Sequence, residues 1–175
     1  LIVVDKPGGM TSHDVVARVR RAVGTRKVGH AGTLDPMATG VLVVGVEKAT
    51  RLLGHLALHD KRYLATVRLG VSTVSDDADG EVVTTSPPEL VRAVSDEQVL
   101  AAAARLVGLL EQRPSSVSAV KVAGRRAYER VRSGEDVQLE PRSVLVSRLD
   151  VVSIERSASH LDVDVDVECS TGTYV

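Results

Sequence analysis

Residues 29–40 read GHAGTLDPMATG, a stretch in which glycines, a proline and small side chains surround one carboxylate, Asp35. Glycine and proline interrupt helices and central strands, so this density of them predicts a loop with a defined shape. The apolar run GVLVVGV at residues 40–46 predicts a fully buried strand directly after the loop, and LIVV at residues 1–4 predicts a buried first strand. Asp35 is therefore expected on a shaped loop that leads into a sheet.

Helical and strand patterns alternate along the rest of the chain. Ser12 is the expected N-cap of a helix that Gly24 ends, and Ser95 is the expected N-cap of a second, alanine-rich helix. Residues 61–70 predict a half-buried strand that places Tyr63 on one face and Arg62 on the other. These alternating elements predict an α/β (α+β) domain with a mixed sheet.

Residues 161–168 alternate strictly between apolar and acidic side chains, with four carboxylates on one strand face. Such a row could hold a metal ion, but same-face residues on a strand lie about 7 Å apart, too far to share one ion unaided. The polar face of an antiparallel sheet is therefore the favoured interpretation. His55 and His59, one helical turn apart, are likewise expected to be surface residues, and the sequence calls for no metal or other cofactor.

The composition is that of a single globular domain of 175 residues that lacks Trp and Phe and contains three tyrosines, Tyr63, Tyr128 and Tyr174. Each tyrosine is therefore a candidate functional residue, because aliphatic side chains are expected to fill the core. One cysteine, Cys169, permits no internal disulfide. No apolar run approaches a membrane span of roughly 18 residues, and the expectation is a cytoplasmic monomer.

Charge is distributed unevenly although the net charge is only −1. Residues 1–70 contain 11 Lys and Arg against 5 Asp and Glu, whereas residues 71–120 contain 3 against 8. A basic face of this kind is either a solvated surface or a contact for a polyanion such as RNA. The candidates for phosphate contacts, chosen for charge alone, are Arg18, Arg21, Lys121, Arg125, Arg126 and Arg130.

Asp35 has two interpretations, since Asp-Pro is a favoured turn dipeptide and a carboxylate can also be a covalent nucleophile toward sugars. The nearby His30, the small neighbours and the basic patches favour chemistry. An ordinary glycosidase would need a second carboxylate as general acid, and the loop contains none. The sequence also lacks the common phosphate-loop, dinucleotide-binding, zinc-protease and serine-hydrolase motifs.

Five segments, in this order and at this spacing, together resemble the TruB family of bacterial tRNA pseudouridine synthases along essentially the whole chain. They are VVDKPGGMTSHDVV, GHAGTLDPMATGVLVV, KRYLATVRLG, RPSSVSAVKVAGRRAYERVRSG and CSTGTYV. The resemblance implies the pseudouridine synthase fold, a mostly antiparallel central sheet flanked by helices and loops. It also implies an isomerase that converts the uridine at position 55, in the T-loop of tRNA, to pseudouridine without cofactor or metal.

The resemblance implies roles for individual residues. Asp35 matches the catalytic aspartate, and its isolation fits a reaction in which the uracil is never released to water. His30 matches a histidine that fills the space left by the flipped nucleotide, Tyr63 a tyrosine that stacks on the target base, and Tyr174 a second pocket tyrosine. Lys6 lies in the family's KPxG loop, where a structural role and a phosphate contact are equally open.

Residues 111–139 match a thumb-like insert that clamps RNA and carries Tyr128, for which core packing is an equal alternative. The family pattern continues beyond Val175 with an arginine that pairs with the catalytic aspartate, a stretch that completes the domain, and in many members a PUA-like RNA-binding domain. Residues 1–175 alone are therefore expected to have weak activity or none. A non-catalytic tRNA-binding module and a glycoside or nucleoside hydrolase built on Asp35 remain as alternatives.

Overall fold

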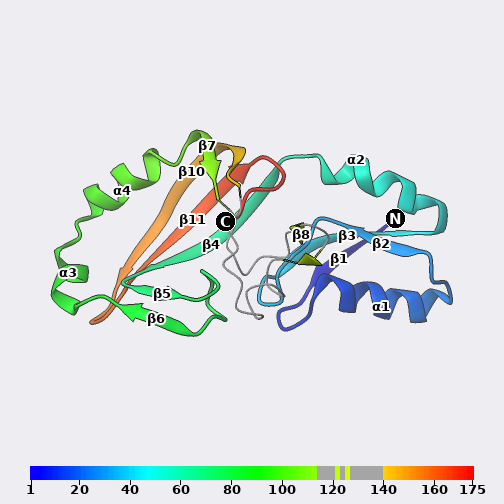
Figure 1. Cartoon of the computed structure of the whole chain (residues 1–175), viewed down its shortest axis with the longest axis horizontal. Coiled ribbons are helices and arrows are strands. Elements are labelled where there is room, and N and C mark those ends of the chain that lie inside the picture. The colour runs from blue at the N-terminus through cyan, green and yellow to red at the C-terminus, as the bar shows by residue number, and fades with distance from the viewer. Residues whose placement is uncertain (114–120, 123–124, 127–139) are drawn as a thin grey trace. The chain divides into compact units, whose positions relative to one another are not determined.

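A computed structural model describes residues 1–113, 121–122, 125–126 and 140–175 of the chain (Figure 1). These residues form two compact units, Leu1–His59 (unit 1) and Asp60–Val175 (unit 2). All strand pairings among the described residues are antiparallel, which confirms an α/β fold with mostly antiparallel sheet. None of the described helices has the length and apolar character needed to cross a membrane.

Unit 1 is built on a three-stranded sheet in the order β1-β3-β2. Its elements are β1 (Ile2–Lys6), α1 (Ser12–Val23), β2 (Val28–Ala31), β3 (Gly40–Val46), a 3-10 helix η1 (Glu47–Leu52) and α2 (Leu53–Ala57). Valines of α1 and of β2 pack with Leu42 and Val44 of β3 to form the core of this unit. The loop that contains Asp35 connects β2 to β3, as the sequence predicts.

The strands of unit 1 are partly exposed, so the predictions of a buried strand at 1–4 and a fully buried strand at 40–46 are wrong. Leu42 and Val44 are completely buried, whereas Val41 is 71% exposed and Val3 of the edge strand is 69% exposed. Helix α1 packs against one face of the sheet, and close contacts of the other face occur where Leu53 lies against Gly29 and Gly45. A continuous apolar run does not reveal which face a neighbouring helix will cover.

The N-cap of helix α1 lies one residue earlier than predicted. Thr11, not Ser12, is the N-cap, and it forms a reciprocal capping box with Asp14. Two hydroxyl residues stand side by side at this position, and the one with extended backbone takes the capping role. The hydroxyl of Ser12 is thereby left for another partner. The predicted stop is confirmed, since Gly24 ends α1 in the left-handed conformation with φ 68°.

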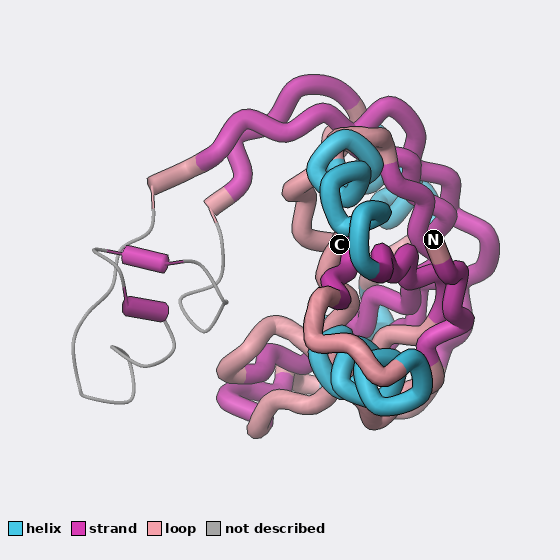
Figure 2. The backbone as a smooth tube through the Cα atoms, turned by 90° about the vertical axis from the view of Figure 1, so that its right-hand side faces the viewer, coloured by secondary structure: helices cyan, strands magenta, loops and turns pink. Residues whose placement is uncertain are grey.

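Unit 2 is built on a four-stranded sheet in the order β4-β11-β10-β7. The strands are β4 (Lys61–Leu69), β7 (Gly108–Gln112), β10 (Arg142–Arg156) and β11 (Leu161–Cys169), and the helices are α3 (Pro88–Ala93) and α4 (Asp96–Ala104). Val91 of α3 and Val99 of α4 pack on the apolar sheet face. A hairpin of β5 (Val71–Thr73) and β6 (Val82–Thr85) adds a second sheet, and β8 (Lys121–Val122) and β9 (Arg125–Arg126) form a short pair (Figure 2).

The alternation of residues 161–168 produces the polar sheet face that the sequence predicts. Opposite β11, the strand β4 places Arg68 beside Asp162, Thr66 beside Asp164 and Leu64 beside Asp166. Arg68 donates two hydrogen bonds to Asp162, of 2.8 and 2.6 Å, and Thr66 donates one of 2.6 Å to Asp164. These carboxylates bind neighbouring side chains, and no metal-type cluster of His, Cys, Asp and Glu occurs among the described residues.

Candidate active site

Asp35 lies in the loop between β2 and β3, with its side chain exposed to solvent. The backbone turns tightly there, because the amide of Ala38 donates a hydrogen bond of 3.1 Å to the Asp35 carbonyl. Within unit 1, all of whose residues are described, the Asp35 carboxylate has no hydrogen bond and no ion pair. The acid is therefore open to a ligand, and its position depends on the backbone around it.

The residue after Asp35 is held through its carbonyl. Pro36 O accepts a hydrogen bond of 2.8 Å from the amide of Gly9 and one of 3.2 Å from Nζ of Lys6. Lys6 is 0% exposed, and its ammonium also donates to the carbonyls of Pro7, at 3.1 Å, and Met10, at 2.7 Å. Three acceptors use all three donors of an ammonium. Of the two roles left open for Lys6, these contacts support the structural one.

The residue before Asp35 is held by Ser12. The Ser12 side chain is 1% exposed, donates a hydrogen bond of 3.1 Å to Leu34 O and accepts one of 2.9 Å from Leu34 N. The Leu34 side chain packs against the core of unit 1. Sequence reasoning missed this contact because it assigned the Ser12 hydroxyl to the helix cap. Buried side chains of the segment that precedes and begins α1 thus fix the chain on both sides of Asp35.

His30 lies on β2, half-buried, next to the same loop. Its Nδ1 lies 2.7 Å from the carbonyl oxygen of Gly32. A carbonyl can only accept, so Nδ1 carries a proton and donates it to Gly32 O. His13 of α1 makes an edge-to-face contact with this ring, with centroids 5.3 Å apart. Sequence reasoning gave His13 no role, since nothing in the spacing of residues 13 and 30 indicates that they meet.

Tyr63 and Tyr174 both belong to unit 2. Tyr63 stands on β4, half-buried against the apolar face of the sheet. Tyr174 is 44% exposed, and its main chain forms two hydrogen bonds with the Gln112 side chain. The Gln112 amide donates to Tyr174 O at 2.7 Å and accepts from Tyr174 N at 2.8 Å. Gln112, at the end of β7, is a second contact that the sequence did not reveal.

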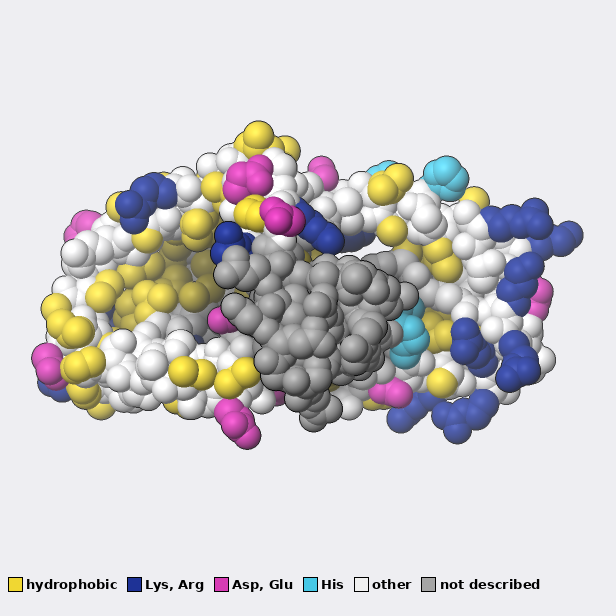
Figure 3. Space-filling view, in the orientation of Figure 1, with side chains coloured by type: hydrophobic (Ala, Val, Ile, Leu, Met, Phe, Trp, Pro, Cys, Tyr) yellow, Lys and Arg dark blue, Asp and Glu magenta, His cyan; other side chains and the backbone are white. Residues whose placement is uncertain are grey.

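The basic side chains of the two units differ in their partners. In unit 2, Arg62 binds Asp166 through hydrogen bonds of 2.9 and 2.7 Å, and Arg68, Arg148 and Arg156 also pair with carboxylates. Among the residues of unit 1, every one of which is described, no Lys or Arg pairs with a carboxylate. The cationic side chains of this unit gather at the end where α1 ends and η1 begins (Figure 3).

The predicted phosphate contacts fall into three groups. Arg18 and Arg21 are exposed on α1 and belong to the unpaired cations of unit 1. The backbone of β8 and β9 places Lys121 opposite Arg126, with Arg125 beside them. Arg130 and Tyr128, like most of the predicted insert 111–139, lie outside the described residues. The insert and these contacts stay predictions.

A comparison with known families decides the membership of the chain. The model of the family described as TruB family pseudouridylate synthase (N terminal domain) matches residues 20–175. The chain belongs to the TruB family. It is 62% identical over its full length to tRNA pseudouridine synthase B of Cutibacterium acnes and 59% identical to that of Rhodococcus jostii. It covers 58% and 56% of these two proteins, so the chain spans little more than half the length of the curated relatives it matches.

Solved structures support the same fold. A chain in the crystal structure of a Cbf5-Nop10-Gar1 complex matches with a TM-score of 0.67 and 30% identity, over 99% of this chain and 40% of that one. A chain in the structure of an H/ACA RNP bound to a substrate RNA containing 2'-deoxyuridine matches with a TM-score of 0.64 and 28% identity, over 98% and 38%. The predicted pseudouridine synthase fold is thereby confirmed for this TruB family member.

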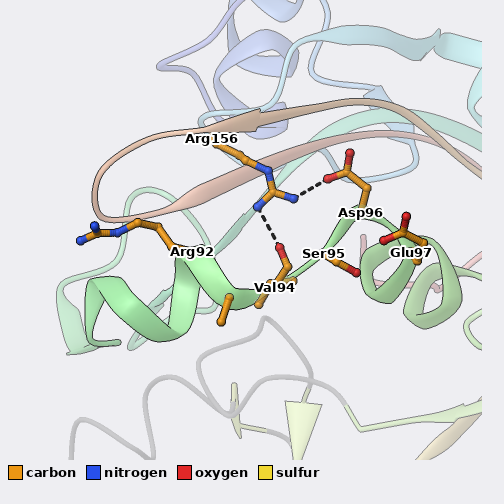
Figure 4. A pocket seen from close by; sticks show the side chains of 7 residues that line it. Arg92, Val94, Ser95, Asp96, Glu97 and Arg156 are labelled. Atoms are coloured by element: carbon orange, nitrogen blue, oxygen red, sulfur yellow. Dashed lines mark hydrogen bonds and ion pairs between the residues drawn. The ribbon is translucent and has the colours of Figure 1, made fainter.

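A hollow of about 400 Å³ opens where α3 meets α4 in unit 2 of the TruB chain (Figure 4). Arg156 crosses it, donating a hydrogen bond of 2.8 Å to Val94 O and pairing with Asp96. The guanidinium of Arg156 is neutralised there by Asp96. The hollow is also lined by Glu97 and by Arg92, whose Nε donates a hydrogen bond to Pro88 O. The predicted site residues that the structure describes lie elsewhere, so the Asp35 loop remains the candidate active site.

Proposed function

We propose that the protein isomerises the uridine at position 55, in the T-loop of tRNA, to pseudouridine. The observation that carries the proposal is the Asp35 loop, in which an exposed carboxylate without a partner in unit 1 stands between two anchored residues. Curated relatives at 62% and 59% identity bear the name tRNA pseudouridine synthase B, which supports the reaction and the substrate class. The position in tRNA follows from the resemblance of the sequence motifs.

In the proposed reaction Asp35 is the nucleophile, attacking either ribose C1′ or uracil C6. The bond between C1′ and N1 breaks, the uracil rotates, and a bond between C1′ and C5 forms. The transient bond between the Asp35 carboxylate and the nucleotide also breaks, so it is absent from the product and the carboxylate is regenerated. N1 gains a proton and C5 loses one, so the product is an isomer of the substrate and no atom is lost. Because the base stays in the site, one carboxylate suffices, unlike the pair that a glycosidase needs.

The remaining site residues bind the flipped nucleotide. Extruding a base from its stack costs a few kcal/mol, and stacking on an aromatic side chain recovers part of that cost. Tyr63 is proposed to stack on the target uracil, Tyr174 to line the same pocket, and His30 to fill the space that the nucleotide leaves. Arg18 and Arg21, exposed and without a salt bridge in unit 1, are proposed to contact phosphates.

The test is Asp35→Asn in the full-length protein, with Asp79→Asn as the matched control. Asp79 is an exposed aspartate of a turn in unit 2, so both variants lose one carboxylate from the surface. Pseudouridine at position 55 is quantified under single-turnover conditions, and tRNA affinity is measured by filter binding. We expect Asp35→Asn to abolish product while keeping tRNA affinity within about twofold, and Asp79→Asn to leave both unchanged.

Other outcomes would contradict the proposal. Undiminished product from Asp35→Asn would remove this carboxylate from the chemistry. Tight tRNA binding without pseudouridine in the unaltered protein would indicate a non-catalytic tRNA-binding module. Free uracil in the wild-type reaction would instead indicate hydrolysis of the glycosidic bond.

A further inference from the structure

We propose that Ser12 is a positioning residue for Asp35: its buried hydroxyl fixes the peptide groups on both sides of Leu34 and so aims the carboxylate. The inference rests on the proposed function and names a residue that fixes the main-chain conformation next to Asp35. The hydrogen bonds of the Ser12 side chain are to Leu34, not to the Asp35 carboxylate. Its effect would be transmitted through the main chain.

The geometry of the hydroxyl supports this role. Ser12 Oγ accepts from Leu34 N at 2.9 Å and donates to Leu34 O at 3.1 Å, so one side chain engages both polar groups of a single residue. Leu34 N belongs to the peptide plane before this residue, and Leu34 O belongs to the plane that continues into Asp35. Rotation of either plane would break one of the two bonds. The orientation of the chain entering Asp35 is therefore determined.

The chain leaving Asp35 is determined in the same way. Pro36 has its φ angle locked by the ring, and a residue that precedes proline is itself restricted in conformation. The Pro36 carbonyl is bound by Gly9 N and by Lys6 Nζ. Asp35 thus lies between two anchored peptide groups, and rotation about its own side-chain bonds is its chief remaining freedom.

The helix does not require this hydroxyl. Thr11 caps α1, and the Leu34 side chain is already packed against the core. An apolar residue at position 12 would also fill a buried site of this kind. What the hydroxyl supplies and an apolar side chain cannot is the simultaneous donor and acceptor for Leu34, which is the property that a positioning role demands.

The sharpest test compares Ser12→Thr with Ser12→Val in the full-length protein, because these two side chains have nearly the same shape and differ in the hydroxyl. A small misplacement of a reacting group can cost about 100-fold in rate. We expect Ser12→Val to slow single-turnover pseudouridine formation by about 10- to 100-fold with tRNA affinity within about twofold, and Ser12→Thr to restore most of the rate.

A stability control separates positioning from folding. Val16 is 3% exposed and belongs to the same helix and core, so Val16→Ala removes buried volume there. The substitution leaves both hydrogen bonds between Ser12 and Leu34 in place. It is expected to lower the melting temperature while leaving the single-turnover rate of the folded protein near that of wild type. Equal rates for Ser12→Val and Ser12→Thr would overturn the proposal. So would a loss confined to tRNA affinity, or an equal slowing by Val16→Ala.

Amide hydrogen exchange gives a readout that needs no activity. The Leu34 amide donates to Ser12 Oγ, so it is expected to exchange slowly in wild type and in Ser12→Thr, and markedly faster in Ser12→Val. Unchanged exchange in Ser12→Val would refute the tether itself. If wild type exchanges slowly but makes no pseudouridine, the proposed function fails while the tether stands.

Discussion

Replacing Lys6 with methionine tests whether this lysine is part of the fold or part of the RNA-binding surface. Methionine keeps most of the volume of the side chain and removes the ammonium. The Pro36 carbonyl would retain the hydrogen bond from Gly9 N at 2.8 Å, whereas the carbonyls of Pro7 and Met10 would lose their donor. Lys6→Met is therefore expected to weaken the anchoring of the segment that faces the Asp35 loop.

The magnitude follows from the number of carbonyls left without a donor. A buried polar group that loses its partner costs about 1–3 kcal/mol. Met10 is half-buried and its carbonyl would bear this cost, whereas Pro7 is exposed and its carbonyl can bind water. A loss of about 1–3 kcal/mol is expected, which corresponds to a fall in melting temperature of about 2–12 °C for a protein of this size.

The assay is thermal unfolding together with tRNA affinity, and Lys48→Met serves as the control. Lys48 is an exposed lysine at the start of η1, in the same unit. Its replacement is expected to change the melting temperature by no more than about 2 °C. If Lys6→Met left the melting temperature unchanged and instead weakened tRNA binding, Lys6 would be a phosphate contact and the structural interpretation would be refuted.

Three further predictions concern pH, salt and the pocket. Hydrogen bonds from Arg62 hold the pKa of Asp166 below its ordinary value. A carboxyl of this kind stabilises the folded protein at pH values above its pKa in the unfolded chain, and that contribution is lost as the pH falls through its lower pKa in the folded protein. Asp166→Asn should therefore lower the melting temperature near pH 7, by a margin that shrinks below about pH 4; a margin independent of pH would count against the ion pair. Neutralising Arg18 and Arg21 should reduce the slope of log affinity against log salt by about 0.7–0.9 for each phosphate that these side chains neutralise, and an unaltered slope would leave them as solvated residues. Tyr63→Ala should reduce single-turnover rate far more than tRNA affinity, whereas equal losses would make Tyr63 a binding residue only.

Local patterns predicted the elements whose signals are periodic. The alternation of 161–168 predicted both faces of β11, and the alternation of 61–70 predicted the faces of β4, because the register of neighbouring antiparallel strands preserves the alternation. The Gly24 stop and the Ser95 cap depend on interactions within a few residues, and both were confirmed. The residues that determine such features lie within the same short segment of sequence, so a local pattern is enough to predict them.

Contacts between distant segments could not be predicted from the residues that make them. The hydroxyl of Ser12 was assigned to the helix cap because a serine before an apolar helix usually caps it, yet its partner is 22 positions away. Lys6 was left between two roles because a lysine beside a glycine-rich loop looks the same whether it is buried or exposed. Burial and hydrogen-bond partners distinguish these roles, and the fold supplies both.

The distribution of ion pairs offers a better guide to polyanion binding than net charge does. A net charge of −1 suggests no affinity for RNA. In unit 2, however, guanidinium groups such as those of Arg62 and Arg68 are matched to carboxylates of β11, so the acidic strand neutralises its own neighbours. Within the fully described unit 1 no Lys or Arg forms a salt bridge with a carboxylate, and the exposed ones direct their field at solvent. A phosphate backbone would find unpaired counter-charges in unit 1, the unit that also holds the Asp35 loop, in addition to the predicted contacts of β8 and β9, although the whole chain is nearly neutral.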